Sequence, residues 1–388
     1  MVSTSSCFGQ VLNLVDRKDF MRAVQQHRAE KGIKGFGCWD QFVSMLFCQM
    51  GAAHSLREIC GGLATALGKV KHLGMEAAPK RTTLAYANVH RPWELYETLF
   101  YQVLTRCQSL ASTKGQKFRF KNPLRSLDAT VIDLCLKTFD WAHFRRAKGA
   151  IKLHLQLDHR GCLPCWGFVT DGKKHEVTVA RLLHLAPGTV VAMDRGYNDY
   201  RLFAEWTRTG VFFVTRMKDN AVYEVVERRE LPAGSHIRKD EVIRLTGLGA
   251  EEKCPCLLRR IIVWDEKKER EIELLTNIMH WAASTIAGIY KSRWQIELFF
   301  KALKQYLKVK TFVGTSENAV KIQIWTALIA ILLLKFLQLK STWKWSLSNL
   351  AAMLRFNLLT YRDLWKWLNA PFDVPVFSPP DEQLALGI

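Results

Sequence analysis

The sequence predicts an α/β protein in which an all-helical N-terminal region precedes a mixed β-sheet with helices on both faces. Three observations lead to this prediction. Apolar residues first recur at helical spacing, the pattern then changes to strand-like alternation, and helical segments return after a second β-rich stretch. The chain has 388 residues and is 48% hydrophobic, so it can bury a substantial core and suggests more than one structural region.

The charge of the chain narrows the choice of partner. Lys and Arg total 56 against 36 Asp and Glu, which gives a formal net charge of +20. Basic side chains that neutralise phosphates release counterions, so nucleic acid is the first candidate partner and an anionic membrane surface the second. A protein that is merely basic is the alternative at this point.

No segment predicts export or membrane insertion. The first ten residues lack the pattern of a signal peptide. The longest apolar run, 324–334, is shorter than the roughly 20 residues of a bilayer span, so we expect a buried core helix there. The ten cysteines follow no repeating framework, which fits a reducing compartment. We therefore expect a cytoplasmic protein that contacts no membrane.

The N-terminal region, residues 1–112, is predicted to be helical. Helices are expected over 39–50, from the capping-box pattern Ser55-Leu-Arg-Glu58, and from Thr82 past a proline to about residue 103. Short helices with scattered basic residues are typical of a small DNA-binding module, but a plain helical bundle with solvated charges is an equal alternative. The basic residues concerned are Lys69, Lys71, Lys80, Arg81 and Arg91.

Residues 113–217 are predicted to form the first part of a sheet-based core. After a basic connector, alternation predicts three consecutive strands. Helix, strand, helix and strand patterns follow. The predicted strands are 124–136, 151–157, 163–169, 189–193 and 211–215, and the predicted helices are 175–185 and 199–209. This order implies a mixed sheet flanked by helices, as in the ribonuclease H fold.

The remaining residues are predicted to complete this core. Residues 218–278 read as a β-rich insertion, 279–357 as the C-terminal helices of the core, and 358–388 as a tail that is extended or frayed. The strand patterns of the insertion are 221–226, 241–245, 258–263 and 272–275, and the helix patterns after it are 282–307, 316–339 and 347–354.

Two aspartates stand out in apolar strands. Asp128 interrupts the first predicted strand, where a charge is costly unless another group compensates it, and Asp133 has the opposite parity in that strand. Asp194 follows the strand 189–193, at the carboxyl end where open α/β sheets place ligands. Taken singly, Asp194 could cap the next helix and Asp128 could be a hydrogen-bonded strand residue. Taken together, they could share one cation.

A third acid lies in the predicted helix 282–307. Tyr290, Glu297 and Lys304 are seven residues apart and Arg293 precedes Glu297 by four, so all four lie along one stripe of the helix. A ladder of solvated ion pairs is the structural alternative. The spacing Tyr-x₂-Arg-x₃-Glu-x₆-Lys resembles the YREK signature of insertion-sequence family four, the cut-and-paste DDE transposases.

The contexts of the two aspartates are similar to the same family. Leu-Asp128-Ala-Thr and Met-Asp194-Arg-Gly-Tyr resemble its first and second acidic motifs, and the β-rich insertion resembles the one that precedes its glutamate. The resemblance covers about residues 120–345. The N-terminal region is similar, more loosely, to a helical domain found in one subgroup.

The resemblance implies a catalytic triad and its metal ions. Asp128, Asp194 and Glu297 would be the catalytic carboxylates and would hold two Mg²⁺ ions, which Mn²⁺ could replace. The implied activity is cleavage of DNA at transposon ends, through end hairpins, and strand transfer into target DNA.

The resemblance also implies the residues that contact DNA. Arg293, Lys304 and Tyr290 would hold backbone phosphates, and Trp264 is the candidate for receiving a flipped base. The alternative for Trp264 is a purely structural role in the core of the β-sheet. The implied partner is double-stranded DNA, both terminal inverted repeats and target, bound by a homodimer assembled on DNA and associated with the bacterial nucleoid. The rival functions are a ribonuclease H-like structure-specific nuclease and a catalytically dead DNA-binding relic.

Overall fold

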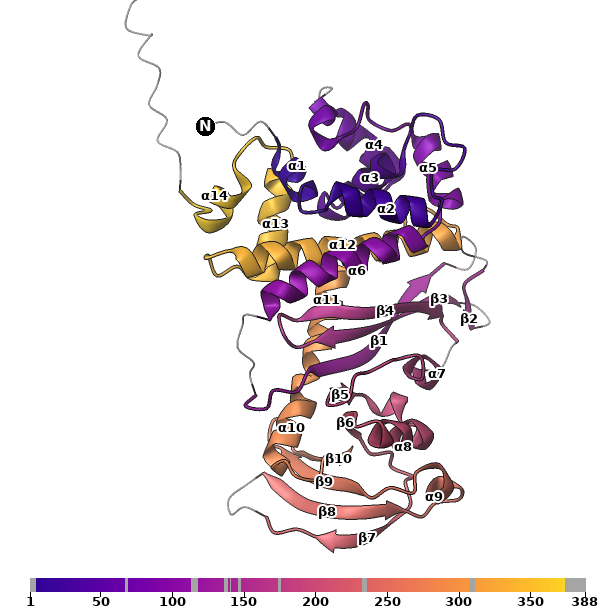
Figure 1. Cartoon of the computed structure of the whole chain (residues 1–388), viewed down its shortest axis with the longest axis vertical. Coiled ribbons are helices and arrows are strands. Elements are labelled where there is room, and N and C mark those ends of the chain that lie inside the picture. Colours follow the sequence, from indigo (N-terminus) through magenta and orange to yellow (C-terminus); the bar gives the residue numbers. More distant parts are fainter. Residues whose placement is uncertain are drawn as a thin grey trace, which may run out of the picture.

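A continuous mixed sheet runs through the centre of the computed structural model (Figure 1). Helices cover both faces of the sheet, and a helical layer that contains the N-terminal region lies at one end. The predicted α/β class and the helical N-terminal region are confirmed. The structure describes residues 5–66, 69–112, 118–135, 139, 141–145, 148–173, 176–231, 236–306 and 311–373.

The first strands have the ribonuclease H-like arrangement that the sequence predicts. β1, β3 and β4 pair antiparallel, β5 lies parallel to β1, and β6 lies parallel to β5. A short strand, β2, forms a hairpin with β3. The bounds of these strands are β1 (Leu124–Leu134), β2 (His143–Arg145), β3 (Lys148–Asp158), β4 (Leu163–Asp171), β5 (Val190–Met193) and β6 (Phe212–Arg216).

The β-rich insertion extends this same sheet. From β6 outward the order is β10, β9, β8 and β7, with every neighbouring pair antiparallel. Buried ion pairs tie the inserted strands together: Arg259 on β9 binds Asp240 on β8, and Arg260 binds Glu241. The bounds are β7 (Tyr223–Arg228), β8 (Ile237–Leu245), β9 (Leu258–Asp265) and β10 (Arg270–Thr276).

Strand alternation sends two sets of apolar side chains to two helical layers. Leu124, Val190 and Val214 pack against α10, whereas Val191 and Phe213, which have the opposite parity, pack against α8. On the first face lie α10 (Ala283–Ser292), α11 (Trp294–Tyr306) and α12 (Glu317–Lys340). On the second lie α7 (Glu176–Ala180), the 3₁₀ turn η2 (Arg195–Tyr197), α8 (Tyr200–Arg208) and α9 (Ala250–Lys253).

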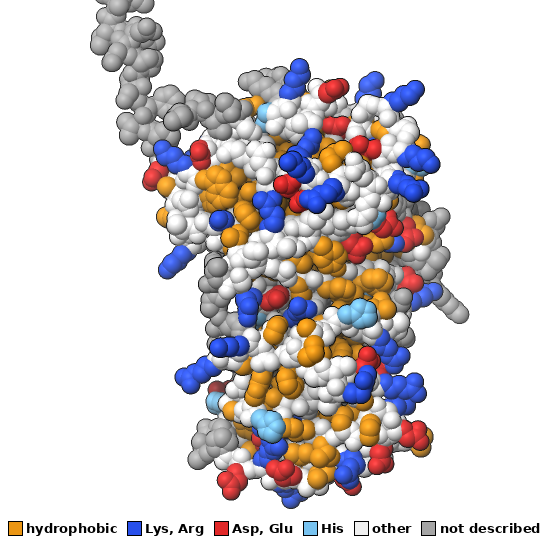
Figure 2. Space-filling view, in the orientation of Figure 1, with side chains coloured by type: hydrophobic (Ala, Val, Ile, Leu, Met, Phe, Trp, Pro, Cys, Tyr) orange, Lys and Arg blue, Asp and Glu red, His pale blue; other side chains and the backbone are white. Residues whose placement is uncertain are grey.

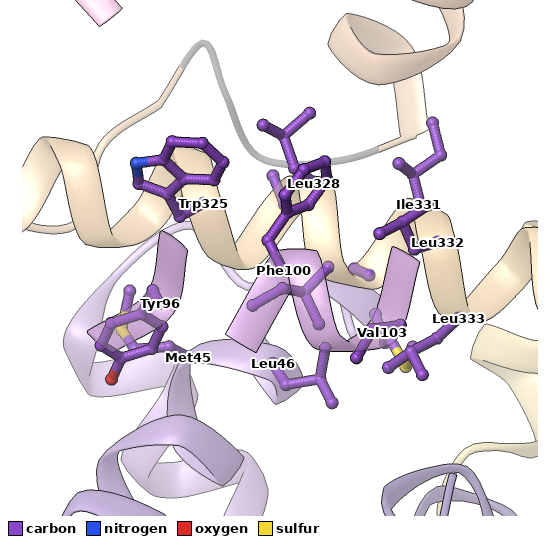
Figure 3. Close-up of a cluster of buried hydrophobic side chains, with 14 of the residues drawn as sticks. Met45, Leu46, Tyr96, Phe100, Val103, Trp325, Leu328, Ile331, Leu332 and Leu333 are labelled. Carbon is purple, nitrogen blue, oxygen red and sulfur yellow. The ribbon is translucent and has the colours of Figure 1, made fainter. Parts of the chain in front are cut away.

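The N-terminal helices share one hydrophobic core with the last helices of the chain. Side chains of α3, α6 and α12 meet in this core; Figure 3 labels Met45, Leu46, Tyr96, Phe100, Val103, Trp325, Leu328, Ile331, Leu332 and Leu333. The helices of this layer are α1 (Cys7–Leu12), α2 (Arg17–Gln26), α3 (Cys38–Met50), α4 (Leu56–Ala64), η1 (Lys69–Leu73), α5 (Arg81–His90), α6 (Glu94–Ala111), α13 (Leu347–Asn357) and α14 (Leu364–Asn369).

The helix α12 confirms the core helix that the apolar run predicts. By length and composition it could cross a membrane, but 83% of its most apolar window is buried inside the protein. It packs against α6 and also approaches β4 closely. A Cβ atom built on Gly167 of β4 would lie 3.4 Å from the Trp325 ring and 3.1 Å from Leu155, so glycine leaves room for this approach.

Four predicted segments differ from the structure. The helix expected past Pro92 is two helices, α5 and α6, because proline lacks the backbone N–H and disfavours a helical residue before it. The helix expected over 175–185 is only α7, with residue 175 outside the described residues. In the described part of the predicted tail, Asp363 caps the short helix α14 and Trp367 buries its side chain, while residues 374–388 lie outside the described residues. The helix expected over 282–307 is interrupted at Arg293.

Candidate active site

Parallel pairing of β1 with β5 brings Asp128 and Asp194 side by side. Leu127 pairs with Met193, so the next residue of each strand occupies an adjacent position, about 5 Å away. By strand alternation both aspartates face the layer of α10 and α11. Asp133, of opposite parity, is exposed.

The interruption at Arg293 brings two further charged groups to these aspartates. The Arg293 N–H bonds to the Tyr290 carbonyl, and the Ile296 N–H bonds to the Arg293 carbonyl, so one tight turn separates α10 from α11. The Arg293 guanidinium then donates from Nη1 to Asp128 Oδ2 at 2.9 Å and from Nη2 to Glu297 Oε1 at 2.6 Å. Arg293 therefore lies between the two carboxylates.

The electrostatics of this cluster favour a bound cation. Burial raises the pKa of Asp128 to about 6; Arg293 and the Ala129 N–H counteract the shift, and the nearby charges of Asp194 and Glu297 add to it. The pKa of Arg293 is affected oppositely by burial, which lowers it, and by Asp128, whose attraction contributes to a net rise. The carboxylates thus carry more negative charge than Arg293 neutralises.

The donor set fits a hard divalent cation, although the carboxylates do not yet converge. Asp128, Asp194 and Glu297 offer only oxygen ligands, which Mg²⁺ and Mn²⁺ prefer. Asp194 has no side-chain hydrogen bond or ion pair with the described residues. Among the described residues, no three His, Cys, Asp or Glu side chains lie close enough together to hold a metal ion. Arg293 occupies the space between two of the three acids, so a cation would have to displace it.

The other stripe residues lie on the same side of the site. Arg293 Cζ is 5.6 Å from the centre of the Tyr290 ring, and burial raises the pKa of Tyr290. Lys304, two turns after Glu297, donates to the Val131 carbonyl of β1 at 2.8 Å. The part of the stripe on α11 therefore faces β1, whereas Tyr290 on α10 lies near Asp194 and Arg216, at the ends of β5 and β6.

Trp264 is not brought to this cluster. It lies half-buried near the end of β9, and β9 is separated from β5 by β6 and β10. Three strand spacings correspond to about 14 Å. Arg238 lies over its ring, with Cζ 5.6 Å from the ring centre.

Sequence reasoning missed Arg216 and Tyr197. Arg216 ends β6 as Asp194 follows β5, and its buried Nε has no hydrogen-bond partner among the described residues. Its charge also acts on Tyr290. Tyr197 is buried beside Asp128 and Asp194; burial, and then the negative charge of Asp128, raise its pKa. The sequence does contain a signal for Arg216. This basic residue ends the buried strand β6, just as Asp194 follows the neighbouring buried strand β5.

Two family models match the chain. The model described as "Transposase DDE domain" matches residues 119–333, which span β1 to α12, and a domain of unknown function, DUF4372, matches residues 3–76. The first match covers more than half of the chain and includes Asp128, Asp194 and Glu297.

Named relatives agree with this match. A protein of Geobacillus stearothermophilus named as a transposase of insertion sequence element IS5377 is 31% identical over 268 residues, covering 68% of this chain and 70% of that protein. A protein of Sinorhizobium fredii named as transposase y4zB is 31% identical over 283 residues, covering 72% and 77%. Transposase InsG for insertion sequence element IS4 of Escherichia coli is 26% identical over 162 residues, covering 39% and 35%.

A solved structure resembles the chain more distantly. The cryo-EM structure of the piggyBac transposase synaptic complex with hairpin DNA aligns with a TM-score of 0.44 at 10% identity, covering 96% of this chain and 82% of that one. At this distance the likeness carries no argument about function. The family match and the named relatives do: the chain belongs to the DDE transposases, DNA-binding enzymes of insertion sequences that cut and join DNA and depend on divalent metal ions.

Proposed function

We propose that Asp128, Asp194 and Glu297 are the catalytic carboxylates of this transposase. The observation that carries the proposal is the position of Arg293, which ion-pairs with both Asp128 and Glu297 while Asp194 lies beside Asp128 without an ion pair in the described residues. The three acids outnumber the two arginines that lie beside them, Arg293 and Arg216, so the cluster keeps surplus negative charge. Structural ion-pair clusters usually balance their charges, so the surplus favours a cation site.

The three carboxylates would hold two Mg²⁺ ions, which Mn²⁺ could replace. When bound, such a pair of ions lowers the pKa of an attacking water or 3′-hydroxyl and stabilises the leaving 3′-oxygen. Asp128 would contact both ions, and Asp194 and Glu297 one each. Asp128, whose pKa is about 6, must be ionised to serve as a ligand, and it is largely so at neutral pH.

Arg293 would change partners between the free and the DNA-bound protein. Its planar guanidinium matches a phosphate as well as a carboxylate, so a DNA phosphate beside the site offers it an alternative ion pair. Lys304 would hold a second phosphate as a point charge, and Tyr290 would pack against the backbone. These roles position the DNA strand relative to the carboxylates.

The proposed reaction begins at the terminal inverted repeats of the element and ends with strand transfer of the 3′ ends into target DNA. We include a hairpin at each end as the intermediate, with Trp264 receiving a flipped base. Joining two ends requires two active sites, so the enzyme would act as a homodimer assembled on DNA, within the bacterial nucleoid.

The N-terminal helical region, proposed as residues 1–112, would add DNA contacts. Lys71, Lys80 and Arg81 are exposed there and suit phosphate binding. Arg91 does not serve this purpose: it is buried and donates to the carbonyls of Phe36 and Gly37.

A cleavage and joining assay tests the proposal. Wild type and Glu297→Ala would be incubated with labelled duplex that carries the end of the element, with Mg²⁺ and with EDTA. We expect wild type to cleave and join only with metal. Glu297→Ala should bind the duplex within about twofold of wild type and form no product, because the contacts that hold DNA lie elsewhere.

Two outcomes would contradict the proposal. Metal-dependent products from Glu297→Ala at the wild-type rate would remove Glu297 from the catalytic set. Cleavage by wild type without joined products, at saturating target DNA, would assign the protein to the structure-specific nucleases.

A further inference from the structure

An open cavity of about 480 Å³ lies between α8 and the turns that flank α9. We call it the α8 cavity. Four basic side chains and one acid contribute to its lining, together with Tyr200. These charged residues are Arg181, Asp199, Arg201, Lys218 and Lys253. Figure 2 shows Lys and Arg side chains on the flank of the molecule that carries α7 and α8.

The charges of the α8 cavity are not internally balanced. Asp199 is already occupied, because it caps α8 and pairs with Arg181. Arg201 and Lys253 are exposed and have no ion pair or side-chain hydrogen bond with the described residues. Lys218 donates to the Asn198 carbonyl at 3.2 Å and has no ion pair with the described residues. The cavity therefore has a surplus of positive charge that faces solvent.

The α8 cavity is tied to the carboxylate cluster through the ends of β5 and β6. Asn198, four residues after Asp194, donates to the Arg216 carbonyl at 2.8 Å and accepts from the Thr215 hydroxyl at 2.8 Å. These bonds fix the cavity wall to the end of β6, and the short chain from Asp194 to Asn198 connects it to the end of β5. Because α8 covers the face opposite α10 and α11, the cavity lies across the strand ends from Arg293.

We propose that the α8 cavity binds backbone phosphates of the DNA that lies beyond the reacting phosphodiester, on the side away from the element. The inference rests on the proposed function, in which residues of α10 and α11 hold the element's own end. DNA that crosses the strand ends must leave over the opposite face. The four residues from Asp194 to Asn198 include the 3₁₀ turn η2, which rises about 2 Å per residue, so the cavity wall lies on the order of 8 Å from Asp194, about two base pairs of duplex.

Two duplexes supply the same phosphate chemistry at this position. Before cleavage it is the flanking donor DNA, and at joining it is the target DNA. Cationic side chains that contact phosphates suit both flanking DNA and target DNA, because phosphate contacts position a duplex and carry no information about its bases. The cavity would therefore serve both reactions without sequence preference.

A double variant, Arg201→Ala with Lys253→Ala, tests the inference in the full-length protein. Both side chains are exposed, so the fold should be unaffected. A control double variant, Lys344→Ala with Lys366→Ala, removes the same charge from exposed positions in the C-terminal segment. Affinity is measured across a salt series for two duplexes, one ending at the element's terminus and one continuing into about 15 base pairs of flank.

We expect the cavity variant to bind the flanked duplex about tenfold more weakly, with the salt slope reduced by about two, because each phosphate contact contributes about 0.9 to the slope. Its affinity for the flankless duplex should stay within about twofold of wild type. The control variant should match wild type on both duplexes.

The rates of cleavage and of joining show whether the bound phosphates belong to flanking DNA or to target DNA. Slower cleavage of flanked ends assigns the cavity to flanking DNA, and slower joining of pre-cleaved ends assigns it to target DNA; either result supports the inference. Equal losses on flanked and flankless duplexes, or no loss on either, would overturn it. Glu297→Ala separates this test from the proposed function, because it should lose chemistry and retain the flank-dependent binding.

Discussion

Two arginines, Arg259 in the insertion and Arg293 near the end of β5, form ion pairs with carboxylates. The hydrogen-bond donors of the two side chains are satisfied very differently. Arg259 binds both oxygens of Asp240, at 2.7 and 2.6 Å, and its remaining nitrogen donates to backbone carbonyls, the shortest bond being 2.6 Å to Trp281. Arg293 gives one nitrogen to each of two carboxylates, and its buried Nε has no partner among the described residues.

The difference shows what separates a structural ion pair from a site. The Arg259 pair is one to one, and both side chains are less than a tenth exposed. In the Arg293 cluster, Asp128 and Glu297 share one guanidinium, and the neighbouring Asp194 has no ion pair with the described residues. Burial raises the pKa of Asp128 to about 6. Arg259 fully satisfies one acid, whereas Arg293 is divided between Asp128 and Glu297 and leaves Asp194 unpaired among the described residues, so carboxylate charge stays available to a ligand.

The largest expected effect is on chemistry. Asp194→Asn should lower the rate of cleavage by about a thousandfold or more, because metal coordination supplies several kcal/mol to the transition state. Its free energy of unfolding should change by less than about 0.5 kcal/mol, since Asp194 has no side-chain partner in the described chain. Single-turnover cleavage and denaturant unfolding measure the two quantities.

The matched change in the insertion is Asp240→Asn. It should leave the single-turnover rate of the folded protein near that of wild type. If Asp240→Asn lowered the cleavage rate as much as Asp194→Asn, the insertion cluster could not be called structural and the Arg293 cluster catalytic.

The next effect is on stability, and its sign should differ between the clusters. Asp240→Asn leaves Arg259 charged and buried, so the free energy of unfolding should fall by about 3–5 kcal/mol. Asp128→Asn should raise it in EDTA at pH 8, by at most roughly 3 kcal/mol, because it removes a carboxylate whose ionisation is disfavoured in the fold.

The sign follows from the direction of the pKa shift. A carboxyl whose pKa rises on folding from 3.8 to about 6 destabilises the fold once it ionises, and this cost is fully present above pH 6 and absent below pH 3.8. The gain from Asp128→Asn should therefore fall to about 0.5 kcal/mol at pH 4. A gain at pH 4 as large as that at pH 8, measured by the same unfolding curves, would show that burial of the charge is not its cause.

Much of the sheet could be predicted because its strands have distinct patterns. Strict alternation marks 151–157, and the wholly apolar run before Asp194 marks a strand covered on both faces, as β5 is. Parity alone separates Asp128 from Asp133. The motif spacing likewise predicts which residues of α10 and α11 face the aspartates.

The rest depends on contacts that local patterns do not encode. The interruption at Arg293 produces no proline or glycine signal, and the ion pairs with Asp128 and Glu297 that it permits cross from helix to sheet. Arg216 was missed because a basic residue at a strand end is common. The α8 cavity joins residues from four separate stretches of chain, so no single stretch marks it.

The pH dependence of the reaction should follow Asp128. At metal concentrations well below saturation, the cleavage rate should fall about tenfold for each pH unit below about 6, because the protonated carboxyl cannot act as a ligand. Saturating metal should move this inflection to lower pH, since the cation competes with the proton. An inflection that stays in place at all metal concentrations would assign the titration to another group.

The smallest expected effect belongs to Trp264, which lies in the charge-balanced insertion and not in the cluster. If it receives a flipped base, Trp264→Ala should slow hairpin formation by up to about tenfold, since stacking of one base contributes about 1–3 kcal/mol and part of this is offset in the ground state. The first nick should keep its wild-type rate, because no base is flipped at that step. Gel analysis of nicked and hairpin products separates the two rates. Trp264→Phe, which retains an aromatic face, should recover most of the loss; if it does not, or if the nick slows equally, Trp264 supports only the sheet.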